Sequence, residues 1–145
     1  MSILSAVEEA WGWTGIRPME LVGENAFGNL MLRDEGGCYW RLCPEDAYCE
    51  IVAANATELA ALQLDQDFLH DWYVQALVNE ARSLLGELDN GQKYCLKIPG
   101  VLGGLYDRTN LGTVPLLELI RFSGLLAYQI KDLPDGSTVN LTITA

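Results

Sequence analysis

The amino-acid sequence predicts an α+β fold in which helices pack on one face of a mainly antiparallel sheet. Three observations support this: a short amphipathic helix at the start, short strands separated by tight turns over residues 19–53, and later helical patterns that alternate with single strands. Half of the 145 residues are hydrophobic. The chain can therefore fill one core, and we expect residues 1–145 to form a single domain.

The first half is predicted to begin with a helix over residues 3–13, where Leu4, Val7 and Trp11 recur at spacings of three and four. Strands are expected at residues 19–22, 29–33, 38–43 and 49–53. Residues 34–37 (DEGG) join the second and third strands, and their glycines can supply the positive φ angles of a hairpin turn. This hairpin is the strongest local signal in the chain.

The middle of the chain is predicted to be helical. Asn55 or Thr57 can cap a short helix that ends at Leu62, and one long helix is expected over residues 65–85, ended by Gly86. The apolar residues at helical spacing predict its buried face: Leu69, Tyr73, Ala76, Leu77, Ala81, Leu84 and Leu85.

The remaining elements are a strand at residues 94–98, an irregular apolar segment at 99–107, a helix over about 115–131 and a closing strand at 138–143. Pro115 suits the first turn of that last helix, and residues 134–136 (PDG) suit the turn that follows it.

The net charge of −11, from 9 basic and 20 acidic residues, limits which kinds of molecule the protein is expected to bind. Phosphate backbones and anionic membranes would repel such a chain, which argues against direct binding of nucleic acid or membrane. The same charge would steer it onto a basic protein, including one whose own site binds nucleic acid or nucleotides. Charge alone is equally consistent with a device for solubility.

The sequence also bears on localisation. The first nine residues lack a basic region before an apolar stretch, and no run approaches the roughly 18 apolar residues of a membrane span. We therefore expect a cytoplasmic protein from a reducing compartment. Four cysteines without zinc-ligand spacing fit free, buried thiols better than disulfides or a metal site: Cys38, Cys43, Cys49 and Cys95.

Few residues suggest catalysis. The single histidine, His70, shares a helical neighbourhood with Asp67 and Asp71, which could orient a base, although a partly exposed surface histidine is the better explanation. Nucleophile-elbow, P-loop and dinucleotide-binding patterns are absent from the sequence. We predict no catalytic residue, no metal and no cofactor.

Candidate partner-binding residues come first from the turns. Asp34, Glu35, Glu45 and Asp46 are placed to contact a basic partner, or are ordinary solvated carboxylates. The segment after Gly103 and Gly104 adds three more candidates: Leu105, Tyr106 and Asp107. Its apolar side chains either fill a gap in the core or present a hydrophobic anchor.

Leu125 is the last candidate. It interrupts the polar face of the last helix, where Glu118, Arg121 and Gln129 lie. An exposed leucine alone is ordinary in a soluble protein, so its position on that face predicts only a possible contact with a partner.

Several segments together resemble one family: residues 24–30 (ENAFGNL), 39–46 (YWRLCPED), 96–99 (LKIP), 102–104 (LGG), 122–124 (FSG) and 129–136 (QIKDLPDG). The family is the C-terminal domain of type VI secretion immunity proteins that neutralise DNase toxins. The resemblance runs from about Trp11 to the end of the chain. It implies a cytosolic antitoxin that binds and occludes a cognate toxin acting on nucleic acid or nucleotides.

One residue departs from the family pattern. The residue after Phe-Ser-Gly is usually acidic in the family and is Leu125 here, which makes it a candidate for toxin specificity. The resemblance leaves open whether the toxin is a DNase or a nucleotide-modifying enzyme, and which oligomeric state the free protein adopts. A non-catalytic regulatory or adaptor module is the alternative.

Overall fold

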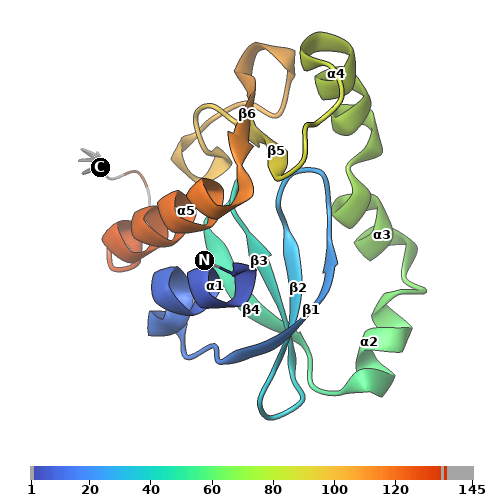
Figure 1. Ribbon diagram of the computed structural model, residues 1–145, viewed down its shortest axis with the longest axis vertical. Helices are drawn as coiled ribbons and strands as arrows, with labels where there is room; N and C mark the ends of the chain where they lie inside the picture. Colours follow the sequence, from blue (N-terminus) through green and yellow to red (C-terminus); the bar gives the residue numbers. More distant parts are fainter. Residues whose placement is uncertain (1, 135, 137–145) are drawn as a thin grey trace.

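The computed structural model describes residues 2–134 and 136, and its centre is a four-stranded antiparallel meander (Figure 1). The strands follow in the order β1 (Pro18–Glu24), β2 (Leu30–Asp34), β3 (Tyr39–Cys43) and β4 (Tyr48–Ala53). A second, two-stranded antiparallel sheet pairs β5 (Gln92–Leu96) with β6 (Leu111–Pro115). The predicted α+β class, with a mainly antiparallel sheet, is confirmed.

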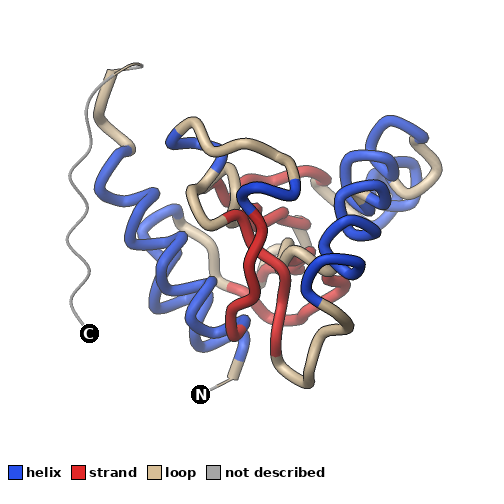
Figure 2. The backbone as a smooth tube through the Cα atoms, turned by 90° about the horizontal axis from the view of Figure 1, so that it is seen from above, coloured by secondary structure: helices blue, strands red, loops and turns tan. Residues whose placement is uncertain are grey.

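Helices cover both faces of the larger sheet, so the expectation of a single covered face was wrong (Figure 2). One face packs against α1 (Ile3–Trp11) and α5 (Leu116–Ile130), and the other against α2 (Ala56–Leu62) and α3 (Gln66–Tyr73). The reason lies in β2, where Leu30, Met31 and Leu32 are all buried. Successive strand residues point to opposite faces, so a continuous apolar run requires cover on both.

The α1–α5 layer packs closely on the sheet. Leu30 lies opposite Leu42 and Leu32 opposite Trp40 in the β2–β3 register, and these side chains share a core with residues of both helices. A Cβ at Gly124 would lie 2.5 Å from the carbonyl oxygen of Ala10, so only glycine permits this approach of α5 to α1.

The predicted long helix over residues 65–85 is two helices, α3 and α4 (Gln75–Leu85), separated by Val74 in the left-handed region at φ 39°. The Asn25 side chain donates to the carbonyl oxygen of Trp72 at 2.7 Å, an acceptor that a continuous helix would use itself. The break rotates the apolar face. Trp72 and Val78 are buried together with Ala81, whereas the predicted Tyr73, Ala76, Leu84 and Leu85 are exposed.

The other local elements are close to their predicted positions. Helix α2 is capped by Asn55, whose side chain accepts from the amide of Glu58 at 2.9 Å, and α5 starts directly after Pro115. Strand β5 begins two residues earlier than expected, and β6 had not been predicted. The predicted closing strand at residues 138–143 lies outside the described residues.

Candidate functional site

A cleft of about 860 Å³ lies between α5, the β5–β6 sheet and the turn that joins β3 to β4. Its apolar lining includes Phe27, Leu96, Leu119, Phe122 and Leu125. Its charged lining comprises Glu9, Glu45, Lys97, Glu118 and Arg121. The cleft is the size of a ligand or peptide pocket and combines an apolar surface with carboxylates of three separate elements.

An exposed apolar segment, residues 98–106, leads away from one wall of this cleft, and we call it the apolar loop. Four of its large side chains are exposed: Ile98 (56%), Val101 (41%), Leu105 (61%) and Tyr106 (48%). They therefore do not fill a gap in the core, which was one of the two interpretations of this segment. Apolar side chains gathered on one exposed loop are typical of a protein-binding surface.

The apolar loop is held in one conformation by the buried side chain of Asn110. Its Nδ2 donates to the carbonyl oxygens of Ile98 and Leu105, each at 2.9 Å, and its Oδ1 accepts from the amide of Ile98 at 2.8 Å. A Cβ at Gly104 would lie 1.7 Å from the carbonyl oxygen of Ile98, so the two arms of the loop approach each other at a glycine. The two arms of the loop are thus joined through contacts within this chain alone.

The loop is also tied to the β3–β4 turn. The Tyr106 hydroxyl donates to the Asp46 carboxylate, and the Val101 amide donates to the Glu45 carbonyl oxygen at 3.2 Å. Burial and the hydrogen bond to Asp46 raise the pKa of Tyr106, so this hydroxyl stays protonated and remains a donor. These contacts bring together segments about sixty residues apart in the sequence.

A chain of polar side chains runs from Glu45 in the cleft through the buried Asn29 and Arg41 to Asp71 on α3. The Glu45 carboxylate accepts from Nδ2 of Asn29 at 2.9 and 3.0 Å, and Oδ1 of Asn29 accepts from Nε of Arg41 at 3.1 Å. Arg41, whose side chain is 6% exposed, pairs with Asp71 at 2.5 Å and lies over the ring of Trp72. Burial raises the pKa of Glu45, although the hydrogen bond from Asn29 acts in the opposite direction.

Five of the eight partner-binding residues predicted from the sequence lie together in this region. Glu45 and Leu125 line the cleft, Asp46 and Tyr106 form the contact between turn and loop, and Leu105 is the most exposed side chain of the apolar loop. Leu125 is 40% exposed, as its position on the polar face of α5 had predicted.

The other three predicted residues have different surroundings. Asp107 caps the 3-10 turn after the loop by accepting from the amide of Thr109 at 2.9 Å. Asp34 and Glu35 lie in the β2–β3 turn, at the opposite end of β3 from Glu45. The Asp34 carboxylate accepts from Nε1 of Trp40 at 2.8 Å and from two backbone amides of its own turn, which lowers its pKa. Asp34 therefore builds the hairpin turn.

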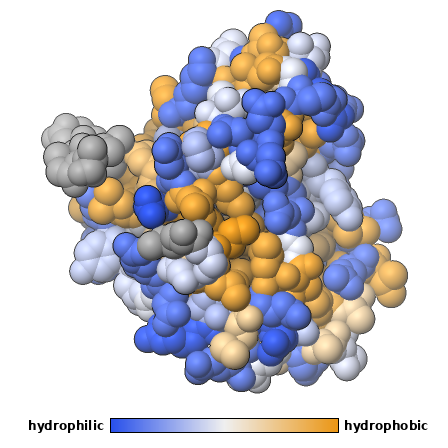
Figure 3. All heavy atoms as spheres, in the orientation of Figure 1, coloured by the Kyte–Doolittle hydropathy of each residue, from blue (hydrophilic) through white to orange (hydrophobic). Residues whose placement is uncertain are grey.

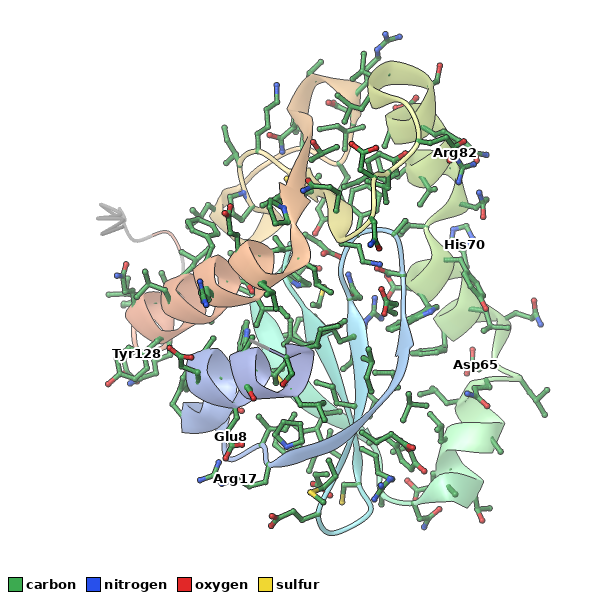
Figure 4. All side chains as sticks on the ribbon, in the orientation of Figure 1. Glu8, Arg17, Asp65, His70, Arg82 and Tyr128 are labelled. Atoms are coloured by element: carbon green, nitrogen blue, oxygen red, sulfur yellow. The ribbon has the colours of Figure 1, made fainter. Side chains whose placement is uncertain are left out.

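The alternative carboxylate site around His70 is not assembled as a catalytic group would be. His70 is exposed on α3, on the other side of the sheet from α5 (Figure 4). The neighbouring Asp71 carboxylate is engaged by Arg41. Within residues 2–134 and 136, no group of three histidine, cysteine or acidic side chains is arranged to hold a metal ion.

The cysteines are free thiols, of which Cys43 and Cys49 are buried and Cys38 and Cys95 half-buried. Burial raises the pKa of Cys43 well above its usual range and that of Cys49 to about 12, so both thiols stay protonated and unreactive.

Other hydrophobic side chains are exposed away from the cleft. Figure 3 shows hydrophobic atoms in the middle of the face drawn there, near α1 and the edge of the larger sheet. On edge strand β1, Met19 and Val22 are 53% and 38% exposed. At the far end of α5, Tyr128 packs edge-on against Trp13, with ring centroids 5.5 Å apart. None of these four side chains lines the cleft.

Sequence reasoning missed Ile98, Val101, Asn29 and Arg41. Ile98 was assigned to the strand at residues 94–98 and Val101 to the irregular segment at 99–107, and neither was considered as an exposed side chain. Arg41 could have been identified from the sequence, because it is the one charged residue in the strand 39–43 (YWRLC). A charge in such a buried strand requires a partner on the facing element.

None of the helices in the described part of the chain combines the length and hydropathy needed to cross a membrane. A comparison with curated proteins gave no match. Among solved structures, the crystal structure of Atu4351 from Agrobacterium tumefaciens is similar, with a TM-score of 0.54 and 19% sequence identity. The similarity covers 83% of this chain and 61% of that one, so the chain spans less than two thirds of its length. At this identity the likeness concerns the fold alone.

The family comparison covers just over half of the chain. The model described as "T6SS immunity protein Tdi1, C-terminal" matches residues 53–127, which include α2 to α4, the apolar loop and most of α5 with its wall of the cleft. The chain therefore belongs to the family of type VI secretion system immunity proteins, as the sequence resemblance had implied.

Proposed function

We propose that this protein neutralises a cognate type VI secretion toxin in the cytoplasm by binding it and covering its active site, without catalysing a reaction. The observation that carries the proposal is the exposed apolar loop beside a cleft whose charged lining comprises three glutamates, one lysine and one arginine. Membership of the immunity-protein family supplies the class of partner.

The apolar loop would provide the anchors of the complex. Its backbone is held by hydrogen bonds to Asn110, and its Tyr106 side chain by the contact with Asp46, so little conformational entropy of the loop is lost on binding. Central apolar and aromatic side chains contribute most of the affinity in typical interfaces and slow dissociation. A stable complex of this kind buries about 1,200–2,000 Å² in total.

The net charge of −11 would supply the steering. Enzymes that act on nucleic acids or nucleotides expose positive charge around their active sites, and an acidic protein is attracted to that region at long range. Attraction of this kind raises the association rate and explains how an inhibitor without catalytic groups could act quickly. DNases and nucleotide-modifying enzymes both present such a surface.

The test is co-expression with the product of the adjacent toxin gene, together with binding of the purified proteins. We expect the wild-type chain to restore growth and to abolish toxin activity at a 1:1 molar ratio. Leu105→Asp should weaken binding at least tenfold, whereas the matched variant Leu64→Asp, at an 80% exposed leucine between α2 and α3, should bind as the wild type does.

Two results would contradict the proposal. If the wild-type chain neither protects cells nor binds the toxin, the function is wrong. If Leu64→Asp weakens binding and Leu105→Asp does not, the protein binds its toxin through a different surface. A regulatory or adaptor module would instead bind a host protein and leave toxin activity unchanged.

A further inference from the structure

We infer that the Glu45 carboxylate, in the wall of the cleft, receives a lysine or arginine side chain that the toxin inserts there. This inference rests on the proposed function and specifies the chemistry of the inserted group. Glu45 is the half-buried member of the charged residues that line the cleft, whereas Glu9, Lys97, Glu118 and Arg121 are exposed.

The charge of Glu45 lacks a cationic partner within residues 2–134 and 136, where no lysine or arginine forms an ion pair with it. Its carboxylate accepts instead from the neutral amide of Asn29 at 2.9 and 3.0 Å. Arg41 is the next group along this chain of hydrogen bonds, but it pairs with Asp71, so Asn29 separates the two charges.

Cys43 and Asp46, which lie close to Glu45 in the sequence, do not supply positive charge. The thiol of Cys43 stays protonated because burial raises its pKa, and Asp46, the next residue, adds a like charge. A half-buried carboxylate whose direct neighbours are neutral or negative loses part of its solvation, and an incoming cation would offset that cost. The raised pKa of Glu45 is consistent with this account.

The lining of the cleft suits a long cationic side chain. Phe27, Leu119 and Leu125 offer apolar surface to the aliphatic stem, while the charged end reaches Glu45. Lys97 and Arg121 also line the cleft, so its charges nearly cancel. The selectivity for a cation would therefore come from the half-buried Glu45 carboxylate and not from the net charge of the lining. A toxin that acts on nucleic acid has such a side chain available, because lysine and arginine contact phosphates in its active site.

The experiment compares Glu45→Gln with Glu80→Gln, a matched change at an exposed glutamate on α4. Dissociation constants are measured against the catalytically inactivated product of the adjacent toxin gene. Loss of one partner from a desolvated charge pair costs at least about 2 kcal/mol, so we expect about 30-fold or greater weakening for Glu45→Gln. Glu80→Gln should change the constant less than threefold.

Folding is checked on the same variants. Glutamine keeps an acceptor for the Asn29 amide, so the thermal midpoint of Glu45→Gln should equal or exceed that of the wild type. If the variant does not fold, Glu45→Asp replaces it, with Glu80→Asp as control, and its shortened carboxylate should weaken binding at least fivefold. If folded Glu45 and Glu80 variants bind the toxin with equal affinity, the inference about Glu45 is wrong. The proposed function still holds in that case, provided that the wild-type protein binds the toxin.

Discussion

Replacing Asn110 by alanine should loosen the apolar loop and weaken toxin binding together. The Asn110 side chain makes three hydrogen bonds, all to backbone groups of Ile98 and Leu105. At about 0.5–1.5 kcal/mol for each bond, their loss should lower the free energy of unfolding by about 2–4 kcal/mol. The partly buried amide of Ile98 would also lose its partner, which places the effect toward the upper end of that range.

The binding effect follows from the same contacts. Re-ordering two or three loop residues on binding costs about 1 kcal/mol or more for each backbone unit, so the dissociation constant should rise at least tenfold. Urea unfolding monitored by tryptophan fluorescence gives the stability, and surface plasmon resonance with inactivated toxin gives the affinity. Asn90→Ala, at an exposed turn residue, is the control.

Two results would refute this reasoning. An unfolding free energy of Asn110→Ala within 0.5 kcal/mol of the wild type would show that the three hydrogen bonds do not hold the loop. A destabilised variant that binds toxin with unchanged affinity would show that the order of the loop is irrelevant to recognition.

Three further predictions concern stability. Gly124→Ala should destabilise the fold by about 1–3 kcal/mol, because its Cβ would meet Ala10, and an unchanged thermal midpoint would contradict this packing. The folded protein lowers the pKa of Asp34, so the stabilising effect of this carboxylate is present above its ordinary pKa of 3.8 and is lost as the pH falls through the folded value. Asp34→Asn should therefore destabilise the protein at pH 7 but much less at pH 3. Urea titrations at both pH values measure the difference. Glu45 has a raised pKa, so stability should fall as the pH rises from its ordinary value of 4.5 through the folded one, and Glu45→Gln should remove that part of the slope.

Local patterns predicted most of the elements. The β2–β3 hairpin depends on its own turn, where Asp34 and the glycines suffice, and α5 depends on a continuous helical pattern after Pro115. Both lie within two residues of their predicted positions because the interactions that form them connect neighbours in the sequence.

The break between α3 and α4 could not be predicted in the same way. Helical propensity is continuous across Val74, and the competing interaction comes from Asn25, 47 residues earlier than the Trp72 carbonyl that it captures. The presence of helices on both faces of the larger sheet could have been predicted from Leu30, Met31 and Leu32, because an unbroken apolar run does not fit a strand with one solvated face.

In the candidate site, too, single residues could be predicted from the sequence, whereas the contacts between distant segments could not. Leu125 and the acidic turn at Glu45 and Asp46 could be singled out by residue type and position, but their neighbours could not. Contact between this turn and Tyr106 depends on how the β5–β6 sheet sits beside the meander, which only tertiary packing decides. The buried path from Glu45 to Arg41 likewise crosses elements that no local pattern connects.

The way Asn110 holds the apolar loop bears on how such a protein could evolve. Its three bonds reach only main-chain atoms, which every amino acid except proline provides. The outward side chains at positions 98 and 105 can therefore be exchanged freely while the framework beneath them persists. If the proposed function holds, substitutions at these two positions would change which toxin is bound while the loop keeps its conformation.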